Sequence, residues 1–261
     1  MMHGLPKLLM IATLSLPLVG CVTERTYTGT DIPVSERTLD KQSAAKERMQ
    51  LGLTYLNRGN MEQAKFNLNR AVEYAPQLSA VHTAMAYYYQ TVGDIERTEE
   101  SYRKAINTSD ATGDAMNNFG VFLCQQEKYS QAEAMFKNAI NAKEYTRTAS
   151  SYENLGVCSL SAGEPEKAKQ YFENALRYDP RRKSTLMELI DLAILENDYD
   201  SAKFNLSRLH RVAEQTPESL ALGIKISREL ADEDAVKRYG ITLIAKYPTS
   251  EQAKEYRATL H

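Results

Sequence analysis

The chain has 261 residues, of which 25% are charged and 43% hydrophobic, with 12 glycines and a formal net charge of −2. This composition is typical of an ordinary soluble helical protein without an excess of turn residues. A nucleic-acid partner would require a basic face, so we expect no nucleic-acid binding.

Residues 1–20 have the pattern of a signal peptide. Lys7 precedes an apolar run from Leu8 to Val19. The run is about 12 residues long, whereas a helix that spans a bilayer needs about 20. We therefore expect an export signal and not a transmembrane helix.

The apolar run ends in Leu18-Val19-Gly20-Cys21, which resembles the bacterial lipobox. This resemblance implies that Cys21 is lipidated and becomes the first residue of the mature chain. It also points to the outer membrane, because Val22 and not Asp follows the cysteine. Each methylene group of a lipid chain contributes about 0.8 kcal/mol when buried, so the protein is predicted to be anchored. The alternative is an ordinary secretory signal that ends in these residues by chance.

Residues 21–44 are rich in threonine and contain few apolar residues, with no helical period. A segment of this composition cannot offset the entropy cost of becoming ordered. We predict a flexible tether of about 20 residues, which could reach tens of Å from the membrane.

From Ala45 onward the sequence repeats every 34 residues. The recurring positions read Leu51-Gly52, Tyr55, Ala64, Leu68, Ala71 and Pro76, later Phe119-Gly120, Ala132, Phe136 and Ala139, and then Leu155-Gly156, Ala168, Phe172 and Ala175. These strings are similar to the tetratricopeptide pattern, in which each repeat is a pair of helices. Small residues let the two helices approach closely, and Leu51, Tyr55 and Leu68 are expected to fill the space between them.

Six such repeats account for almost all of residues 45–261. They are expected near 45–78, 79–112, 113–146, 149–182, 183–215 and 216–249, with two extra residues inserted before the fourth. The last two are degenerate, since Ile190 replaces the small residue and the Ala231–Asp234 connection is short. Because one pair cannot bury its apolar face alone, the predicted fold is all-α, a right-handed superhelix of stacked tetratricopeptide pairs.

Cys124 and Cys158 are 34 residues apart and fall on first helices of neighbouring repeats. An exported protein meets an oxidising compartment, so a disulfide between them is permitted. The alternative is two buried, unpaired cysteines, because a bridge requires Cα atoms about 4.4–6.8 Å apart.

The sequence offers no catalytic motif. The histidines His3, His82, His210 and His261 are scattered, and no metalloprotease, phosphate-loop or nucleophile-elbow string is present. His82 stands where a large packing residue is expected. We therefore expect no enzymatic activity, no metal and no cofactor.

The remaining functional feature is the inner face of the repeats. In tetratricopeptide architecture certain positions of each first helix line this face. The residues at these positions that we predict to bind a partner are Met49, Leu53, Leu56, Asn57, Thr83, Tyr87, Gln90, Asn117 and Val121. An apolar helix or an extended segment suits such a surface better than a charged tail. Alternatively, Leu53 and Leu56 only cover the first repeat, which no helix pair precedes.

The lipobox, the tether and the six repeats together resemble the type IV pilus biogenesis and stability lipoproteins over the full length. Asn118-Phe119-Gly120 and Asn154-Leu155-Gly156 lie in strings that resemble that family's third and fourth repeats. The resemblance implies a non-enzymatic pilotin, anchored in the outer membrane and facing the periplasm. Such a protein binds the secretin subunit of the type IV pilus, promotes its localisation and multimerisation, and so supports twitching motility.

A second hypothesis is a lipoprotein scaffold of the same build that serves barrel assembly or cell-wall synthesis. Repeats and a lipobox alone indicate only an interaction scaffold tethered to the outer membrane. In either case we expect the chain to be a monomer before it binds its partner.

Overall fold

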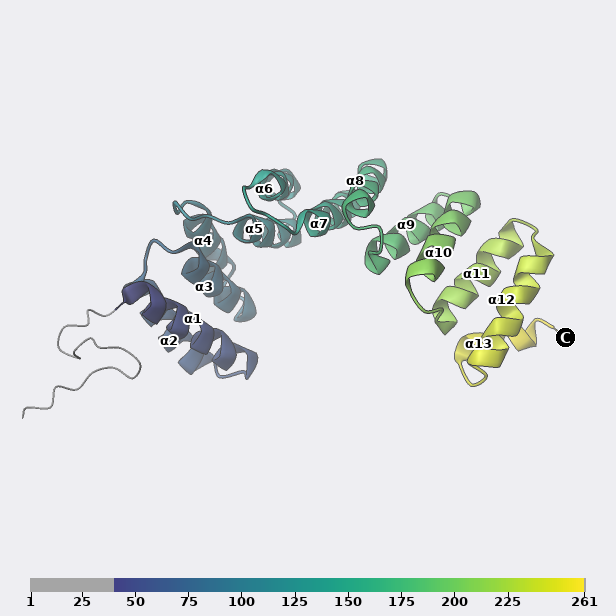
Figure 1. Ribbon diagram of the computed structural model, residues 1–261, viewed down its shortest axis with the longest axis horizontal. Coiled ribbons are helices and arrows are strands. Elements are labelled where there is room, and N and C mark those ends of the chain that lie inside the picture. Colours follow the sequence, from purple (N-terminus) through teal and green to yellow (C-terminus); the bar gives the residue numbers. More distant parts are fainter. Residues whose placement is uncertain (1–39, 261) are drawn as a thin grey trace, which may run out of the picture. The chain divides into compact units, whose positions relative to one another are not determined.

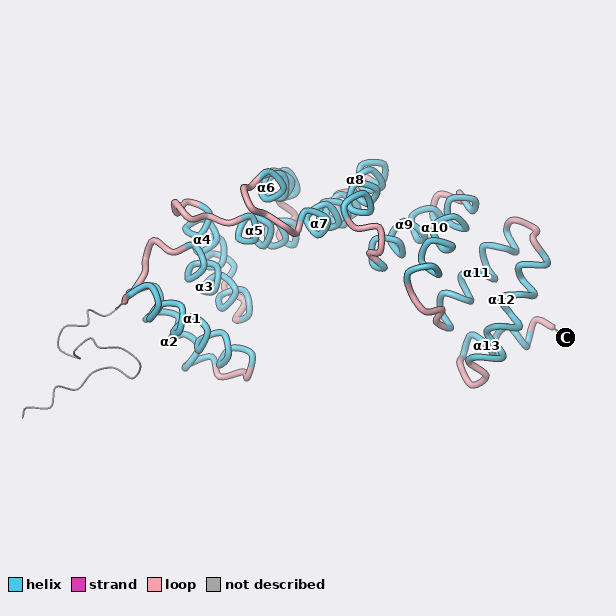
Figure 2. Tube along the Cα trace, viewed as in Figure 1, coloured by secondary structure: helices cyan, strands magenta, loops and turns pink. Residues whose placement is uncertain are grey.

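The computed structural model describes residues 40–260, and this part of the chain contains thirteen helices and no strand (Figure 2). The chain divides into the units Met1–Asp40 and Lys41–His261, and all the described helices belong to the second. The predicted signal peptide, Cys21 and most of the predicted tether lie outside the described residues.

Twelve of these helices form six consecutive pairs, labelled in Figure 1. The pairs are α1 (Lys41–Asn57) with α2 (Met61–Tyr74), α3 (Ser79–Thr91) with α4 (Ile95–Ile106), α5 (Gly113–Gln125) with α6 (Tyr129–Asn141), α7 (Thr148–Ser161) with α8 (Pro165–Tyr178), α9 (Lys183–Leu195) with α10 (Tyr199–Val212), and α11 (Pro217–Glu229) with α12 (Glu233–Lys246). A thirteenth helix, α13 (Glu251–Ala258), follows them. The all-α tetratricopeptide fold is therefore confirmed.

Helix α1 begins earlier than we predicted. The tether was expected to extend to residue 44, but the helix already starts at Lys41 and has 17 residues. The residues Lys41, Gln42 and Ala44 are good helix formers, so they continue the helix of the first repeat by one turn. Their polarity made this turn look like part of the tether.

The small residue of the first helix makes room for a large residue of the second. A Cβ atom built on Gly120 would lie 2.7 Å from Cε1 of Phe136, and one on Gly156 would lie 2.4 Å from Cε1 of Phe172. Both phenylalanine rings are almost fully buried. The missing Cβ therefore sets how closely the helices of each pair approach.

The turn between the two helices has the same backbone conformation in each of the six pairs. A residue in the left-handed backbone region ends the turn, and it is glycine in three repeats, for example Gly93 with φ of 77°. In the other three it is Glu127, Asn197 or Ala231, with φ between 53° and 59°. Side-chain caps then start several second helices, as when Asp94 accepts a hydrogen bond from the Arg97 amide at 3.1 Å.

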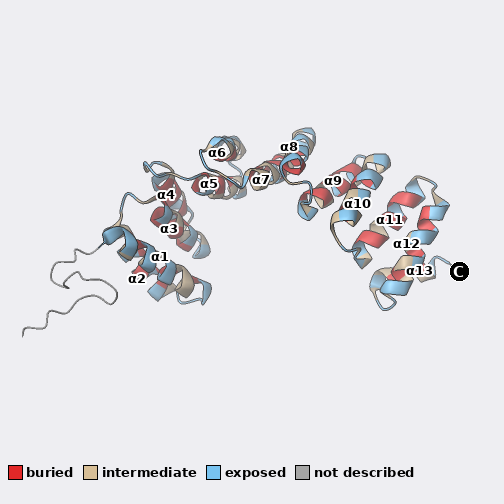
Figure 3. Ribbon diagram, in the orientation of Figure 1, coloured by how far each residue is buried: buried red, intermediate tan, exposed pale blue. Residues whose placement is uncertain are grey.

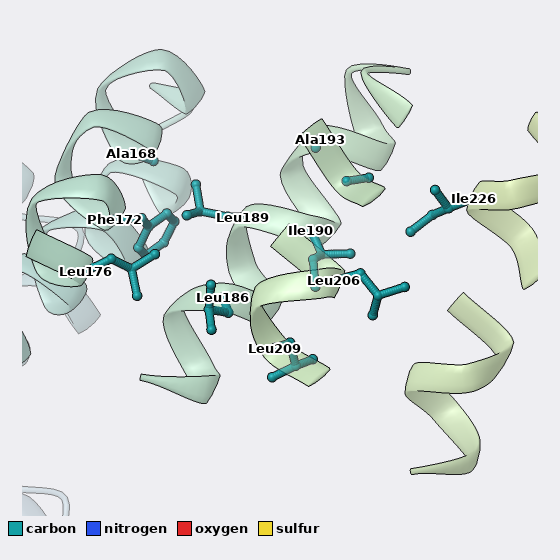
Figure 4. Close-up of a cluster of buried hydrophobic side chains, with 11 residues drawn as sticks. Ala168, Phe172, Leu176, Leu186, Leu189, Ile190, Ala193, Leu206, Leu209 and Ile226 are labelled. Carbon is teal, nitrogen blue, oxygen red and sulfur yellow. The ribbon is translucent and has the colours of Figure 1, made fainter. Parts of the chain in front are cut away.

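Buried side chains form clusters that join neighbouring repeats (Figure 3). Figure 4 shows the cluster in which Phe172 and Leu176 of α8 meet Leu189 of α9 and Leu206 of α10, with Ile226 of α11 at its edge. A second cluster joins α3 and α4 to α5, α6 and α7. Stacking therefore buries the apolar face that a single pair would leave exposed.

The two ends of the stack differ. At the C-terminal end Ala253 and Tyr256 of α13 pack on Leu220 and Leu243, so α13 closes the last repeat. We did not predict this helix. At the N-terminal end no helix among residues 40–260 precedes α1, and Leu51 is 40% exposed, although we expected it to fill the space between α1 and α2. The equivalent Met85, Phe119, Leu155 and Leu189 are buried because each packs toward the preceding repeat.

Ion pairs connect the second helices to the next repeat. The charged side chain at the equivalent position of α4, α6, α8 and α10 forms an ion pair with a residue at or next to the turn of the following helix pair. The pairs are Glu99–Lys128 at 2.6 Å, Glu133–Lys167 at 2.6 Å, Lys169–Glu196 at 3.2 Å and Lys203–Asp232 at 2.8 Å. The sign of the charge changes after the second of them, so each junction carries its own complementary pair.

Candidate partner-binding face

The first helices of the first four repeats lie next to one another, since α1 contacts α3, α3 contacts α5, and α5 contacts α7. On each of them an apolar residue is followed one turn later by an uncharged polar residue. We call the first set, Leu53, Tyr87, Val121 and Val157, the apolar row, and the second set, Asn57, Thr91, Gln125 and Ser161, the polar row. Residues four apart share a face of a helix, so the two rows run side by side.

The apolar row is partly open to solvent. Tyr87 is 47% exposed and Val157 is 43% exposed. Leu53 and Val121 are half-buried against the clusters below them. This row therefore presents apolar surface without being part of the core.

Amide side chains bridge α3 and α5 beside the polar row. Gln90 Nε2 donates a hydrogen bond to Gln125 Oε1 at 3.1 Å, and the Tyr102 hydroxyl donates to Gln90 Oε1 at 3.3 Å. Burial raises the pKa of Tyr102 to about 12, so this hydroxyl keeps its proton. The Gln90 side chain is thereby fixed, while Gln125 Nε2 makes no hydrogen bond within residues 40–260.

Two residues that we assigned to the binding face are part of the interior. Leu56 is 4% exposed and packs with Ala84 and Met85 of the next repeat. Asn117 is 4% exposed, and its Oδ1 accepts hydrogen bonds from Ser151 Oγ at 2.8 Å and Asn154 Nδ2 at 3.0 Å. In both cases the following repeat covers the residue, which the sequence position alone did not indicate.

The other residues that we predicted to bind a partner are half-buried or exposed. Met49 is half-buried and packs against the first-repeat clusters, so it supports the face from below. Thr83 donates a hydrogen bond to the Ser79 carbonyl oxygen at 3.1 Å and is also half-buried. Asn57 is exposed at the end of α1. Of the predicted set, Leu53, Asn57, Tyr87, Gln90 and Val121 therefore remain on or beside one surface.

A disulfide joins Cys124 of α5 to Cys158 of α7, with a Cα–Cα distance of 5.8 Å. Of the two alternatives left open by the sequence, the structure contains the bridge. Val121 lies one turn before Cys124, and Val157 directly precedes Cys158. The bond therefore ties together the two helices that carry the second half of the apolar row.

Charged residues lie on this face of several first helices, since Lys46 of α1 and Asp114 of α5 stand two turns before Leu53 and Val121. The Glu153 carboxylate of α7 pairs with the Arg182 guanidinium. Burial, together with the carboxylates of Asp191 and Glu153, raises the pKa of Glu188. Asp191 stands at the position on α9 where the earlier repeats carry the apolar row, so that row ends at α7.

The structure provides no evidence for a catalytic or metal centre in the described residues. His82 is 8% exposed and its Nε2 lies 2.7 Å from the Pro76 carbonyl oxygen, which makes it a packing residue. Residues 40–260 contain no group of three His, Cys, Asp or Glu side chains that could hold a metal ion. None of the described helices is both long and apolar enough to span a membrane.

Sequence reasoning missed two exposed phenylalanines on second helices. Phe66 of α2 is 51% exposed and Phe204 of α10 is 60% exposed. The guanidinium carbons of Arg70 and Arg208 lie 5.7 Å and 5.5 Å from the respective ring centroids. The signal was present, since Ala64-Lys65-Phe66-Asn67-Leu68 recurs as Ala202-Lys203-Phe204-Asn205-Leu206.

A stack of helix pairs with an apolar and polar inner face defines a tetratricopeptide protein, the class that mediates contacts between proteins. Three tetratricopeptide repeat models match the chain, over residues 48–78, 111–181 and 159–223. The type IV pilus assembly protein PilF of Pseudomonas aeruginosa is 33% identical over 249 residues, covering 95% of this chain and 97% of PilF. The chain therefore belongs to the PilF family of type IV pilus biogenesis proteins.

Solved structures agree with this assignment. The structure of Pseudomonas aeruginosa PilF superposes with a TM-score of 0.66 at 34% identity, covering 84% of this chain and 99% of that one. The crystal structure of PilW, described as a widely conserved type IV pilus biogenesis factor, gives a TM-score of 0.63 at 24% identity. It covers 81% of this chain and 97% of PilW, and at this identity it supports the fold alone.

Proposed function

We propose that this protein is an outer-membrane lipoprotein pilotin that binds the type IV pilus secretin subunit. In this role it brings the subunit to the outer membrane and promotes its multimerisation. The observation that carries the proposal is the similarity to PilF, named as a type IV pilus assembly protein, over 95% of this chain and 97% of that one. Because the match spans both chains almost completely, it includes the whole repeat stack.

The shape of the site supports a binding role without catalysis. The first four repeats place an apolar row beside a polar row on contacting helices, which is a surface for another protein. A channel subunit that enters a membrane is itself rich in apolar segments. A half-exposed tyrosine such as Tyr87 is a suitable anchor, because aromatic residues are enriched among interface hot spots.

The anchor is proposed from the lipobox-like residues that end in Cys21, which lie outside the described part of the chain. Several acyl chains, each methylene contributing about 0.8 kcal/mol, hold a protein at a membrane far more firmly than one. Lipidation would deliver any bound subunit to the same membrane.

The test is the substitution Cys21→Ala, with the neighbouring Thr23→Ala as its matched control. Membrane fractionation should find the Cys21→Ala protein folded in the soluble periplasmic fraction, and native gels should show fewer secretin multimers at the outer membrane. The Thr23→Ala protein should remain with the outer membrane. A Cys21→Ala protein that still sediments with the outer membrane would contradict the lipid anchor.

The partner is tested separately by affinity capture from detergent-solubilised membranes. Recovery of the secretin subunit with the full chain is the expected result. Recovery of barrel-assembly subunits or of a peptidoglycan synthase in its place would reject the pilotin and favour the scaffold hypothesis.

A further inference from the structure

The chain around the connection between the fourth and fifth repeats is strongly basic. Residues 177–183 contain one carboxylate, that of Asp179, and four cations, which are Arg177, Arg181, Arg182 and Lys183. Most of the other connections that follow a second helix contain no lysine or arginine, namely those at residues 75–78, 107–112, 213–216 and 247–250. Residues 177–183 therefore form a local positive charge in a chain whose formal net charge is −2.

Most of this positive charge is not compensated within the protein. The Arg182 guanidinium pairs with the Glu153 carboxylate, and the Asp179 carboxylate lies 3.9 Å from the same guanidinium. The exposed cations that form no ion pair within residues 40–260 are Arg177, Arg181 and Lys183. The Arg177 guanidinium donates a hydrogen bond to Asn174 Oδ1, but this amide oxygen carries no formal charge. Three cations are thus available to an anionic partner.

An exposed aromatic ring stands among these cations. Tyr178 is the last residue of α8 and is 62% exposed. Its ring stacks on that of Tyr152, with centroids 5.5 Å apart and an angle of 20° between the ring planes. Tyrosine is enriched where proteins meet the surface of a membrane, and lysine and arginine attract anionic lipids. We call the set Arg177, Tyr178, Arg181 and Lys183 the basic edge.

The basic edge lies on the side of the stack at which the chain enters from Cys21. First helices run in the same direction, since Asn117 meets Ser151 near the starts of α5 and α7, and a disulfide joins these helices near their ends. The second helix of each pair runs back, so every first helix begins and every second helix ends on one side. That side includes both Lys41, where α1 begins, and the connection between α8 and α9.

We infer that the basic edge rests on the anionic headgroups of a phospholipid membrane, the one to which the chain is anchored. This inference rests on the proposed function, because the lipid anchor holds the protein beside that membrane. A cluster that binds a membrane without help typically has about four to eight basic residues, more than are free here. The predicted tether supplies the remainder, because a flexible chain of about 20 residues spans about 25 Å and keeps the edge at a high effective concentration near the surface.

Contact at this edge gives the repeats around it a defined orientation. The axes of α7 and α9 run from this side of the stack to the opposite side, so these helices stand upright on the membrane. Val157 lies on the side of α7 and therefore faces along the membrane surface and not into it. A subunit in the same membrane can then approach the apolar row from the side.

The experiment uses tryptophan as a reporter, because the chain contains none. The lipidated Tyr178→Trp protein is inserted from outside into phosphatidylcholine vesicles that contain about one third phosphatidylglycerol. A lipid with a nitroxide-labelled headgroup then quenches any tryptophan at the surface. The matched control is Leu195→Trp, because Leu195 is 78% exposed and lies at the other end of α9, about 18 Å from Lys183.

At low salt we expect quenching of Tyr178→Trp to be about threefold stronger than quenching of Leu195→Trp. Salt at about 1 M, where the Debye length is about 3 Å, should abolish this difference. Equal quenching of the two reporters would overturn the inference. Quenching of Tyr178→Trp that is just as strong in vesicles of pure phosphatidylcholine would overturn it as well.

Charge reversal tests whether the cations of the basic edge make the contact. Arg181→Glu combined with Lys183→Glu should reduce the quenching of Tyr178→Trp to the level of the Leu195→Trp control. The matched control is Lys237→Glu combined with Arg238→Glu, which reverses two exposed cations on α12 that form no ion pair within the described residues. It should leave the quenching unchanged. If both double variants, or neither, lose the quenching while circular dichroism shows them folded, the basic edge is not the contact.

The result is distinct from the test of the lipid anchor. If the lipidated protein inserts into vesicles and Tyr178→Trp is quenched no more than Leu195→Trp, this inference fails and the anchor stands. If the protein purified from membranes carries no lipid, the anchor fails. The same two reporters in the Cys21→Ala protein, at high concentrations of anionic vesicles, then decide the inference, since equal quenching overturns it and stronger quenching of Tyr178→Trp supports it.

Discussion

The close approach of α7 and α8 at Gly156 makes a strong test of how each helix pair is packed. A Cβ atom at this position would lie 2.4, 2.5 and 2.8 Å from the Cε1, Cδ1 and Cζ atoms of Phe172. Phe172 is fully buried, so its ring has no free space into which it can move. We therefore expect Gly156→Ala to force α7 and α8 apart.

The expected change in the unfolding free energy of Gly156→Ala follows from two opposing effects. Overpacking of a well-packed core costs about 1–3 kcal/mol, and the gain in helix propensity from Gly to Ala offsets about 1 kcal/mol. Because three ring atoms lie within 3 Å of the new atom, the net loss of unfolding free energy should be about 1–2 kcal/mol. Gly52→Ala should cost less, since its contacts at 2.7 and 2.9 Å are with the flexible side chain of Leu68.

The assay is urea unfolding of the oxidised chain, followed by circular dichroism, in a double-mutant cycle with Phe172→Leu. The smaller leucine should relieve the overlap, so the double variant should be more stable than the sum of the two single losses allows. If Gly156→Ala is as stable as the parent, or if the two losses simply add, the contact does not determine the packing.

Three further perturbations test other parts of the fold. Lys169→Glu should lower the unfolding free energy at low salt by about 1 kcal/mol, and adding Glu196→Lys should restore most of this loss. A double variant that is no more stable than Lys169→Glu alone would contradict a stabilising ion pair. Ala231→Gly should raise the urea midpoint by the equivalent of about 1 kcal/mol, because Ala231 has φ of 53°, and an unchanged midpoint would argue against backbone strain there. Burial lowers the pKa of His210 in the folded protein. The contribution of the neutral imidazole to the unfolding free energy should therefore be complete above the unfolded pKa of about 6.5, and it should be lost as the pH falls through the lower folded pKa. His210→Gln should therefore flatten the stability profile below about pH 6.5, and a profile unchanged by the substitution would exclude this histidine as the cause.

The helix pairs could be predicted because each is determined by residues within one 34-residue period. The small residue at Gly120 and the aromatic at Phe136 meet inside one pair, and their spacing in sequence fixes that contact. The insertion before the fourth repeat was also visible, and it lengthens the connection between α6 and α7. The spacing of residues in the sequence is therefore sufficient to predict contacts that form within one helix pair.

Burial on the inner face could not be predicted in the same way, because it depends on the next repeat. Leu56 and Asn117 occupy positions that line the face in the general architecture, yet the following helices cover both. Leu51 shows the reverse effect, since its usual cover is a preceding repeat and no helix among the described residues precedes α1. Helix α13 was missed because a single closing helix has no second helix with which to complete the pattern.

The ion pairs that join neighbouring repeats and the exposed apolar row lie on different helices. On the second helices, pairs such as Lys169 with Glu196 join one repeat to the next. The most exposed members of the apolar row, Tyr87 and Val157, lie on first helices and take no part in these ion pairs. Salt screens the exposed ion pairs over a Debye length of about 10 Å at 0.1 M but has little effect on apolar contacts. Stacking and recognition can therefore be perturbed independently, which allows a loss of binding to be distinguished from a loss of the fold.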